Sequence, residues 1–214
     1  MNVLIGFTAS VGSILAPKIV YAFRAAGFDV GTICTPKTIP AFTNSNDLEA
    51  AGAQGFYSDN SEWSWERAEA GAGVVQGYNG DGEKIYFSET WQKGDAVKHI
   101  ELREKYDMLV VAPMSANTLG KMTVGICDNL LTSVLLAWKY KEKPVVIAPA
   151  MNTEMWESPI TQANLKRIQI LLPNITIVSP QEKMLACGTM GNGALANIDD
   201  IVAASLHVYN SIYK

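Results

Sequence analysis

The chain has 214 residues, of which 48% are hydrophobic and 18% charged, and its formal net charge is -4 at pH 7. This length and composition predict a single globular domain with a full hydrophobic core. The negative charge and the lack of any lysine and arginine cluster argue against a nucleic-acid-binding surface.

The first residues, MNVLIGFTAS, lead directly into an apolar run. They have neither the basic region nor the small-residue cleavage site of a secretory signal. No apolar run approaches the roughly 18 residues of a membrane span. The cysteines, Cys34, Cys127 and Cys187, form no CxxC pair, so we expect reduced thiols rather than disulfides or a zinc site. We therefore expect a cytoplasmic protein without a metal.

Short apolar runs alternate with helical stretches along most of the chain. Strands are expected over residues 3–6, 29–34, 108–112, 145–148 and 175–178. Helices are expected over residues 13–26, 118–138, 160–172 and 198–209, with Gly27 as the C-terminal cap of the first. Cys34 would end a strand and Cys127 would lie inside a helix, both as core residues. Strands that are apolar on both faces and separated by helices predict a mostly parallel sheet covered on both sides.

Residues 67–94, approximately, depart from this alternation. Glycines are frequent there, and Asn-Gly and Asp-Gly turn signals precede a weak strand at 84–87. We interpret the segment as a surface insertion, a hairpin, within one domain that spans residues 1–214.

The loops that follow the first two expected strands carry small and hydroxylated residues. The segment GFTASVGS, residues 6–13, joins a strand to a helix, so its backbone N–H groups and the Ser10 hydroxyl could approach an anion. It is not a GxGxxG sequence, and a tight turn without a ligand explains it equally well. The segment CTPKT, residues 34–38, adds two hydroxyls and an ammonium at the same edge of the sheet. The two loops together favour a phosphate site.

The next two strand ends read PMSANTLGK and PAMNTEMW. Asn117 and Asn152 therefore emerge from neighbouring strands, each beside small residues that would let a flat ring approach the backbone. Asparagine and serine are also ordinary helix N-caps, which is the structural alternative for Ser115 and Asn152.

The blocks HIELR, SANTLGK, GICDNLLT, PAMNTEMW and ACGTMGNGALA occur in this order. This combination resembles the homo-oligomeric flavin-containing cysteine decarboxylases, and most closely the branch that acts on 4'-phosphopantothenoylcysteine in coenzyme A biosynthesis. The resemblance covers almost the whole chain. It implies a flavodoxin-like or Rossmann-like three-layer sandwich and a homotrimer with FMN near the subunit interfaces.

The resemblance also implies roles for particular residues. The FMN-binding set would be Ala9, Ser10, Val11, Thr35, Thr38, Ser115, Ala116, Asn117, Thr118 and Ala150. The catalytic set would be His99, Asn152 and Cys187. The substrate-binding set would be Asn152, Met155, Ala186, Arg103 and Lys183. Arg103 and Lys183 are only candidates for the phosphate anchor, since Leu15 replaces a lysine that is usual in the family.

The family reaction explains why these residue types are suitable. An N-acyl cysteine carboxylate cannot simply lose CO2, because the resulting carbanion has no electron sink. The resemblance implies that FMN first oxidises the thiol to a thioaldehyde, which then accepts the electrons of the departing carboxylate as an enethiolate. Reduced flavin and a proton donor finally restore a saturated thiol. The cofactor would supply the redox step, and the protein orientation and proton handling.

Each catalytic candidate also has a purely structural alternative. Asn152 could hold the carboxylate through its neutral amide without strong ground-state stabilisation, or it could simply cap a loop. His99 could transfer a proton near neutral pH, or it could be an ordinary helix-end histidine. The only other histidine, His207, lies in the last helix and is expected to be structural. Cys187 lies in a glycine-rich loop that we expect to close as a lid, where its thiol could donate a proton.

Two other functions of the same fold are possible. Peptidyl-cysteine decarboxylases share the PxMNxxMW pattern but act on a peptide C-terminus. Some relatives are non-catalytic regulatory subunits, which commonly lose a catalytic residue or carry long acidic tails. The presence of His99, Asn152 and Cys187 together favours an enzyme over a regulatory subunit.

Overall fold

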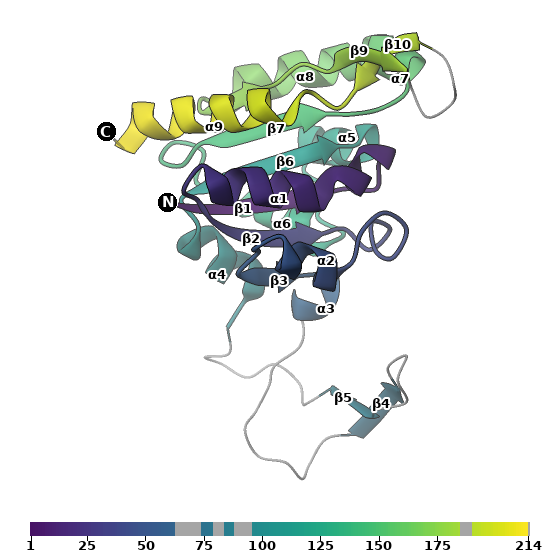
Figure 1. Ribbon diagram of the computed structural model, residues 1–214, viewed down its shortest axis with the longest axis vertical. Helices are drawn as coiled ribbons and strands as arrows, with labels where there is room; N and C mark the ends of the chain where they lie inside the picture. Colours follow the sequence, from purple (N-terminus) through teal and green to yellow (C-terminus); the bar gives the residue numbers. More distant parts are fainter. Residues whose placement is uncertain (63–73, 79–83, 88–95, 185–189, 214) are drawn as a thin grey trace.

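The computed structural model describes residues 1–62, 74–78, 84–87, 96–184 and 190–213. Its centre is a six-stranded sheet in the order β3-β2-β1-β6-β7-β8, in which all neighbouring strands are parallel (Figure 1). The strands are β1 (Asn2–Phe7), β2 (Asp29–Cys34), β3 (Gly55–Tyr57), β6 (Met108–Met114), β7 (Val145–Pro149) and β8 (Ile175–Ile177). The predicted parallel sheet is confirmed. The winding of the chain reverses between β1 and β6, which is where ligands of such sheets bind.

Helices cover both faces of the sheet, which confirms the three-layer fold. The first hydrophobic core includes residues of α1 (Ala16–Ala25), α2 (Ser45–Ala50) and α9 (Ile198–Tyr213). The second includes residues of α4 (Lys98–Lys105), α5 (Ala116–Val124), α6 (Leu130–Ala137) and α8 (Pro159–Leu171). Side chains alternate across a strand, so Val3 and Ile5 of β1 enter the first core and Leu4 the second.

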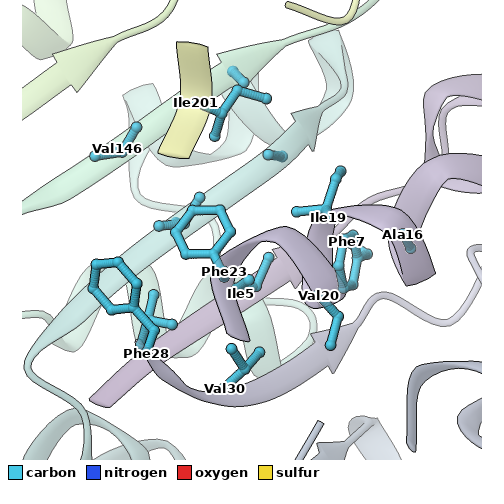
Figure 2. Close-up of a cluster of buried hydrophobic side chains, with 14 of the residues drawn as sticks. Ile5, Phe7, Ala16, Ile19, Val20, Phe23, Phe28, Val30, Val146 and Ile201 are labelled. Atoms are coloured by element: carbon cyan, nitrogen blue, oxygen red, sulfur yellow. The ribbon is translucent and has the colours of Figure 1, made fainter. Parts of the chain in front are cut away.

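The first core joins the sheet to α1 and α9. Ile5 of β1, Phe23 of α1 and Ile201 of α9 belong to the cluster drawn in Figure 2, and all three are fully buried. The ring centroids of Phe23 and Phe28 are 5.4 Å apart, and the two ring planes are tilted by 55°. Burying one such side chain contributes about 1.5–3 kcal/mol, so this cluster fixes α1 against β1 and thereby positions the loop between them.

The first predicted helix is present but begins in a different form. Residues Val11–Leu15 form the 3-10 helix η1, and the α-helix starts at Ala16, followed by Pro17. Proline is well suited to the first turn because it lacks the N–H that would have no partner there. At the other end, Gly27 has φ 87°, and Phe28 N–H donates to the Phe23 carbonyl at 3.0 Å. The predicted glycine cap is confirmed.

The predicted helix over residues 118–138 is wrong, because the structure has α5 and α6 with a loop between them. Gly125 ends α5 with φ 77°, a conformation that favours glycine. Asn129 then caps α6: its Oδ1 accepts from Thr132 N–H at 3.0 Å, and Thr132 Oγ1 accepts from Asn129 N–H at 3.2 Å. Cys127 lies in this loop and is exposed, so its predicted place inside a helix is also wrong.

Several short elements have no strong sequence signal. They are α3 (Asp59–Glu62), α7 (Thr153–Glu157) and the antiparallel pair β9 (Gln181–Met184) and β10 (Met190–Ala194). Within the predicted insertion, β4 (Val74–Tyr78) pairs antiparallel with β5 (Lys84–Phe87), as expected for a hairpin. The rest of residues 67–94 lies outside the described residues. Of the helices that are described, none has the length and apolar character needed to cross a membrane.

Cys34 is predicted to resist alkylation in the folded protein. It is 1% exposed, and burial raises the pKa of its thiol to about 12. At pH 8.5 this leaves roughly a thousandfold less thiolate than an ordinary cysteine has. Peptide mapping after iodoacetamide treatment should show Cys34 unmodified in native protein and modified after unfolding in guanidinium. Alkylation of native Cys34 at the rate of a free thiol would contradict this burial.

Candidate functional site

A large groove lies at the carboxyl edge of the sheet, beside the β1–β6 switch point. It is lined by the loops that follow β1, β2, β6 and β7 and by residues of β9 and α9, and its cavity volume is about 2310 Å3. Small-molecule sites usually have about 300–1,000 Å3. The groove is therefore large enough for a cofactor and a substrate together.

Thr8 links the two loops at the switch point. Its buried Oγ1 donates to the Pro113 carbonyl at 2.8 Å and accepts from Ser115 N–H at 2.8 Å. Its own carbonyl accepts from the Ser13 hydroxyl at 2.7 Å. The loops that follow β1 and β6 are thus held at a fixed separation, a role for Thr8 that sequence reasoning missed.

The loop after β1 joins that strand to η1 beside the groove. Ser10 precedes η1 in an extended conformation, and its hydroxyl donates to the Ala150 carbonyl at 3.3 Å instead of capping the helix. The first backbone N–H groups of a helix have no acceptor within the helix. Ala9, Ser10 and Val11 all line the groove. Both interpretations of the loop, a phosphate site and a turn without a ligand, are compatible with this geometry.

The two threonines after β2 differ in their access to the groove. Thr35 lines the groove, and its Oγ1 is 2.8 Å from Thr38 Oγ1. Thr38 is fully buried, does not line the groove and donates to the Phe7 carbonyl at 3.2 Å. Thr35 is thus accessible from the groove, whereas Thr38 is buried and contacts Thr35.

The loop after β6 provides a second set of predicted residues. Ser115 caps α5, with its Oγ accepting from Thr118 N–H at 3.3 Å, so the structural alternative for this serine is correct. The cap does not remove it from the groove, which Ser115, Ala116, Asn117 and Thr118 all line. Asn117 is exposed and Thr118 is buried. Of these four, Asn117 presents the side chain most accessible to a ligand.

Asn152 caps a helix, as the structural alternative predicts, and it also lines the groove. Its Oδ1 accepts from Glu154 N–H at 2.9 Å and so caps α7, while the exposed side chain lines the groove. Because the oxygen is used by the cap, the Nδ2 group is the part of the amide that can donate to a ligand. Ala150 and Met155 line the groove on either side. The cap therefore fixes the direction of the amide without removing the residue from the groove.

The β9–β10 hairpin borders the same loop. Gly193 of β10 accepts a hydrogen bond from Met151 N–H at 2.9 Å. Lys183 of β9 is exposed and lines the groove, and its role as a phosphate anchor stays a prediction. Ala186 and Cys187, which the sequence places between β9 and β10, lie outside the described residues.

His99 and Arg103 do not line this groove. Both belong to α4, on the second-core face of the sheet. His99 Nδ1 is 2.5 Å from Glu62 Oε1, and Arg103 forms hydrogen bonds of 2.7 and 3.0 Å with Glu104. A single copy of the chain thus does not bring His99 into the groove that contains Asn152.

Helix α5 and the loop that follows it add groove residues that were not predicted. Lys121 and Asp128 line the groove with their side chains 2.5 Å apart, and Asn129 lies beside them. The hydrogen bond from Lys121 holds the pKa of Asp128 below its usual range. Both Asp128 and Asn129 belong to the block GICDNLLT, which carries part of the family resemblance, so a signal for them was present.

Comparison with known proteins assigns this chain to a family. The family model described as Flavoprotein matches residues 1–210, so the chain belongs to that family, and the expected flavin class of cofactor is confirmed. The chain is 55% identical over 108 residues to the phosphopantothenoylcysteine decarboxylase of Oryza sativa subsp. japonica, an alignment that covers 50% of this chain. The resemblance that the sequence motifs predicted is confirmed.

Two solved structures resemble almost the whole chain. One is a mutant PPC decarboxylase complexed with pantothenoylaminoethenethiol, with 34% identity, a TM-score of 0.78 and coverage of 98% of both chains. The other is the FMN binding protein AtHal3, with 35% identity, a TM-score of 0.75 and coverage of 98% of this chain and 97% of that one. The alignment with the Oryza sativa protein, in contrast, spans only 48% of that protein.

Proposed function

We propose that this chain is an FMN-dependent decarboxylase that converts 4'-phosphopantothenoylcysteine to 4'-phosphopantetheine in coenzyme A biosynthesis. One observation carries the proposal: Asn152 lines the same groove as the loop at Ser10, which we interpret as the phosphate site. The Nδ2 group of Asn152 is not used by its helix cap and can donate to a substrate. The chain resembles a PPC decarboxylase that was solved in complex with pantothenoylaminoethenethiol, and this likeness supports the choice of substrate.

The groove residues fit FMN by their chemistry. The hydroxyls of Ser10 and Thr35 and the N–H groups at the start of η1 suit a phosphate, and the small side chains of Ala116 and Ala150 suit a flat ring. When bound, FMN supplies the redox chemistry, because it can take a hydride from the cysteine side chain and return it later. The protein residues must then hold the carboxylate and manage protons.

Asn152 is the residue that holds the leaving carboxylate in this proposal. Its Nδ2 hydrogens can donate to a carboxylate without the strong attraction of a buried cation. A strong ion pair would stabilise the ground state more than the transition state, in which that charge disperses into CO2. The amide is fixed by the α7 cap, so little side-chain freedom remains to be lost on binding.

We further propose that the chain acts as a homotrimer, in which the α4 face of one copy completes the groove of another. His99 would then act on a substrate held by Asn152 of a neighbouring copy. Exposed apolar side chains beside the groove, Ile14 at 61% and Tyr21 at 69%, support self-association there. Sedimentation equilibrium should give three times the chain mass of 23.2 kDa. A monomer would contradict this assembly.

Cys187→Ser is expected to retain the flavin and release CO2 but to accumulate an enethiol product. In this proposal the thiol donates the proton that completes re-reduction, and serine is a far weaker acid. Mass spectrometry of the product should show a compound with two hydrogens fewer than phosphopantetheine. Formation of the normal saturated thiol at an unchanged rate would remove Cys187 from this role.

The proposal as a whole is tested by purification and a single assay. The protein should be yellow and release FMN on denaturation, and CO2 should form from phosphopantothenoylcysteine. A peptide with a C-terminal cysteine, offered in parallel, tests the peptidyl-cysteine alternative. A colourless protein that cannot take up FMN would refute the function, and a flavin-loaded protein inactive with both thiols would favour a regulatory role.

A further inference from the structure

Glu62 and His99 form a close pair away from the groove. Glu62 is the last residue of α3, and its side chain is 6% exposed, whereas the His99 side chain on α4 is 24% exposed. The Oε1 and Nδ1 atoms are 2.5 Å apart, so the carboxylate and the imidazole are in direct hydrogen-bonding contact.

The position of Glu62 is fixed by contacts outside its own short helix. Asp59, at the other end of α3, accepts from Leu130 N–H at 3.1 Å and so joins α3 to the start of α6. Helix α4 packs against both α3 and α6. Helix α3 is therefore attached to both α4 and the start of α6, and this places the Glu62 carboxylate beside His99.

A buried carboxylate determines which imidazole nitrogen carries the hydrogen. An ionised carboxylate can only accept hydrogen bonds, so its partner Nδ1 must be the N–H donor. In a neutral imidazole, Nε2 then has the free lone pair. Most histidines in water favour the opposite tautomer slightly, so the pairing would impose a form that the free side chain adopts less often.

We propose that Glu62 is a positioning residue that holds the His99 imidazole in the Nδ1–H tautomer and presents Nε2 as the proton acceptor. The inference rests on the proposed function, in which His99 acts on the substrate. It assigns a role to a residue that motif reasoning did not single out. The physical need is orientation, because a proton acceptor contributes only when its lone pair points at the proton.

Imidazole NMR tests the tautomer without turnover. The chain has two histidines, and the exposed His207 on α9 provides an internal reference. In 15N-histidine protein at pH 8.5, His99 should show the Nδ1–H form. In Glu62→Gln the introduced side-chain amide can donate as well as accept, so it no longer requires Nδ1–H. The 15N signals of His99 should therefore shift toward those of the Nε2–H tautomer. Glu101→Gln on the same helix, which removes an exposed charge paired with Lys98, should leave His99 unchanged.

Kinetics test whether the orientation matters for catalysis. Glu62→Gln should lower kcat by about 10- to 100-fold, part of the 10²–10⁴ that general acid–base catalysis supplies, with KM changed less than threefold. In Glu62→Gln/His99→Asn, kcat should be no lower than in His99→Asn alone, because a positioning residue has no effect once its partner is absent. Additive losses would overturn the proposal, as would wild-type kcat and tautomer in Glu62→Gln.

The outcomes separate this inference from the proposed function. If flavin-loaded wild-type protein releases no CO2, the function fails, and the NMR comparison still decides whether Glu62 fixes the tautomer. If Glu62→Gln does not fold, as judged by thermal unfolding, Glu62→Asp replaces it in both experiments. The shorter carboxylate keeps the acceptor charge, so it should preserve the Nδ1–H form while lowering kcat, and loss of that form would count against the proposal.

Discussion

Gly193→Ala is expected to lower decarboxylation at least about 100-fold and to destabilise the fold by about 2–4 kcal/mol. A Cβ at this position would lie 2.4 Å from the Met151 carbonyl oxygen, and Gly193 has φ +143°, which alanine rarely adopts. The obstacle is backbone, so no side-chain rotation can relieve it. The β10 strand must move away from the loop that carries Asn152, and the hydrogen bond from Met151 N–H to the Gly193 carbonyl would break.

The effect should appear in kcat/KM for CO2 release and in the midpoint of thermal unfolding. Gly120→Ala is the matched control: a Cβ there meets nothing within 4 Å, and the residue lies inside α5. Since alanine is the better helix former by about 1 kcal/mol, this variant should be at least as stable as wild type and equally active. Wild-type activity in Gly193→Ala would show that β10 does not hold the Asn152 loop in place.

The central sheet could be predicted because its signals are local. Apolar runs bounded by turns mark β1, β2, β6 and β7, and Gly27 marks the end of α1. The three residues of β3 have no such pattern, and they are a strand only because Gly31 and its neighbours in β2 pair with them. The division between α5 and α6 was missed because the apolar residues on both sides of Gly125 continue the helical period.

The candidate site could be predicted where it consists of strand ends. The carboxyl ends of parallel strands share one edge, so Ser10, Thr35, Asn117 and Asn152 had to lie near each other once the sheet was expected. Contacts between distant segments could not be predicted in this way. The hydrogen bonds of Thr8 join residues more than 100 positions apart, and nothing near Glu62 in the sequence indicates His99.

The capping residues explain why structural and functional interpretations were hard to separate. Ser115 and Asn152 are both N-caps, as the structural alternative required, and both line the groove. A cap uses one acceptor of the side chain and fixes its direction. For Asn152 the cap uses Oδ1 and leaves the Nδ2 donors outside the hydrogen bond that starts α7, so capping does not preclude the role that we propose for the amide.

Asn152→Asp is expected to separate the two roles, because it should leave stability within about 0.5 kcal/mol of wild type and abolish most activity. Aspartate is as good an N-cap as asparagine, and a negative charge at a helix N-terminus is favourable. It cannot donate to a carboxylate. Losing a hydrogen bond to a charged group costs about 1.5–3 kcal/mol, and repulsion adds to this, so kcat/KM should fall roughly 100- to 1000-fold.

Three measurements on matched variants decide this prediction: thermal unfolding, bound FMN and CO2 release. Asn152→Asp should differ from wild type only in CO2 release. Asn152→Ala removes the cap acceptor that Glu154 N–H needs, so it should lose about 1 kcal/mol of stability as well as activity. If Asn152→Asp decarboxylates the substrate normally, the amide does not hold the leaving carboxylate, and its place in the groove is only that of a cap. If it unfolds as readily as Asn152→Ala, the geometry of the α7 cap is wrong.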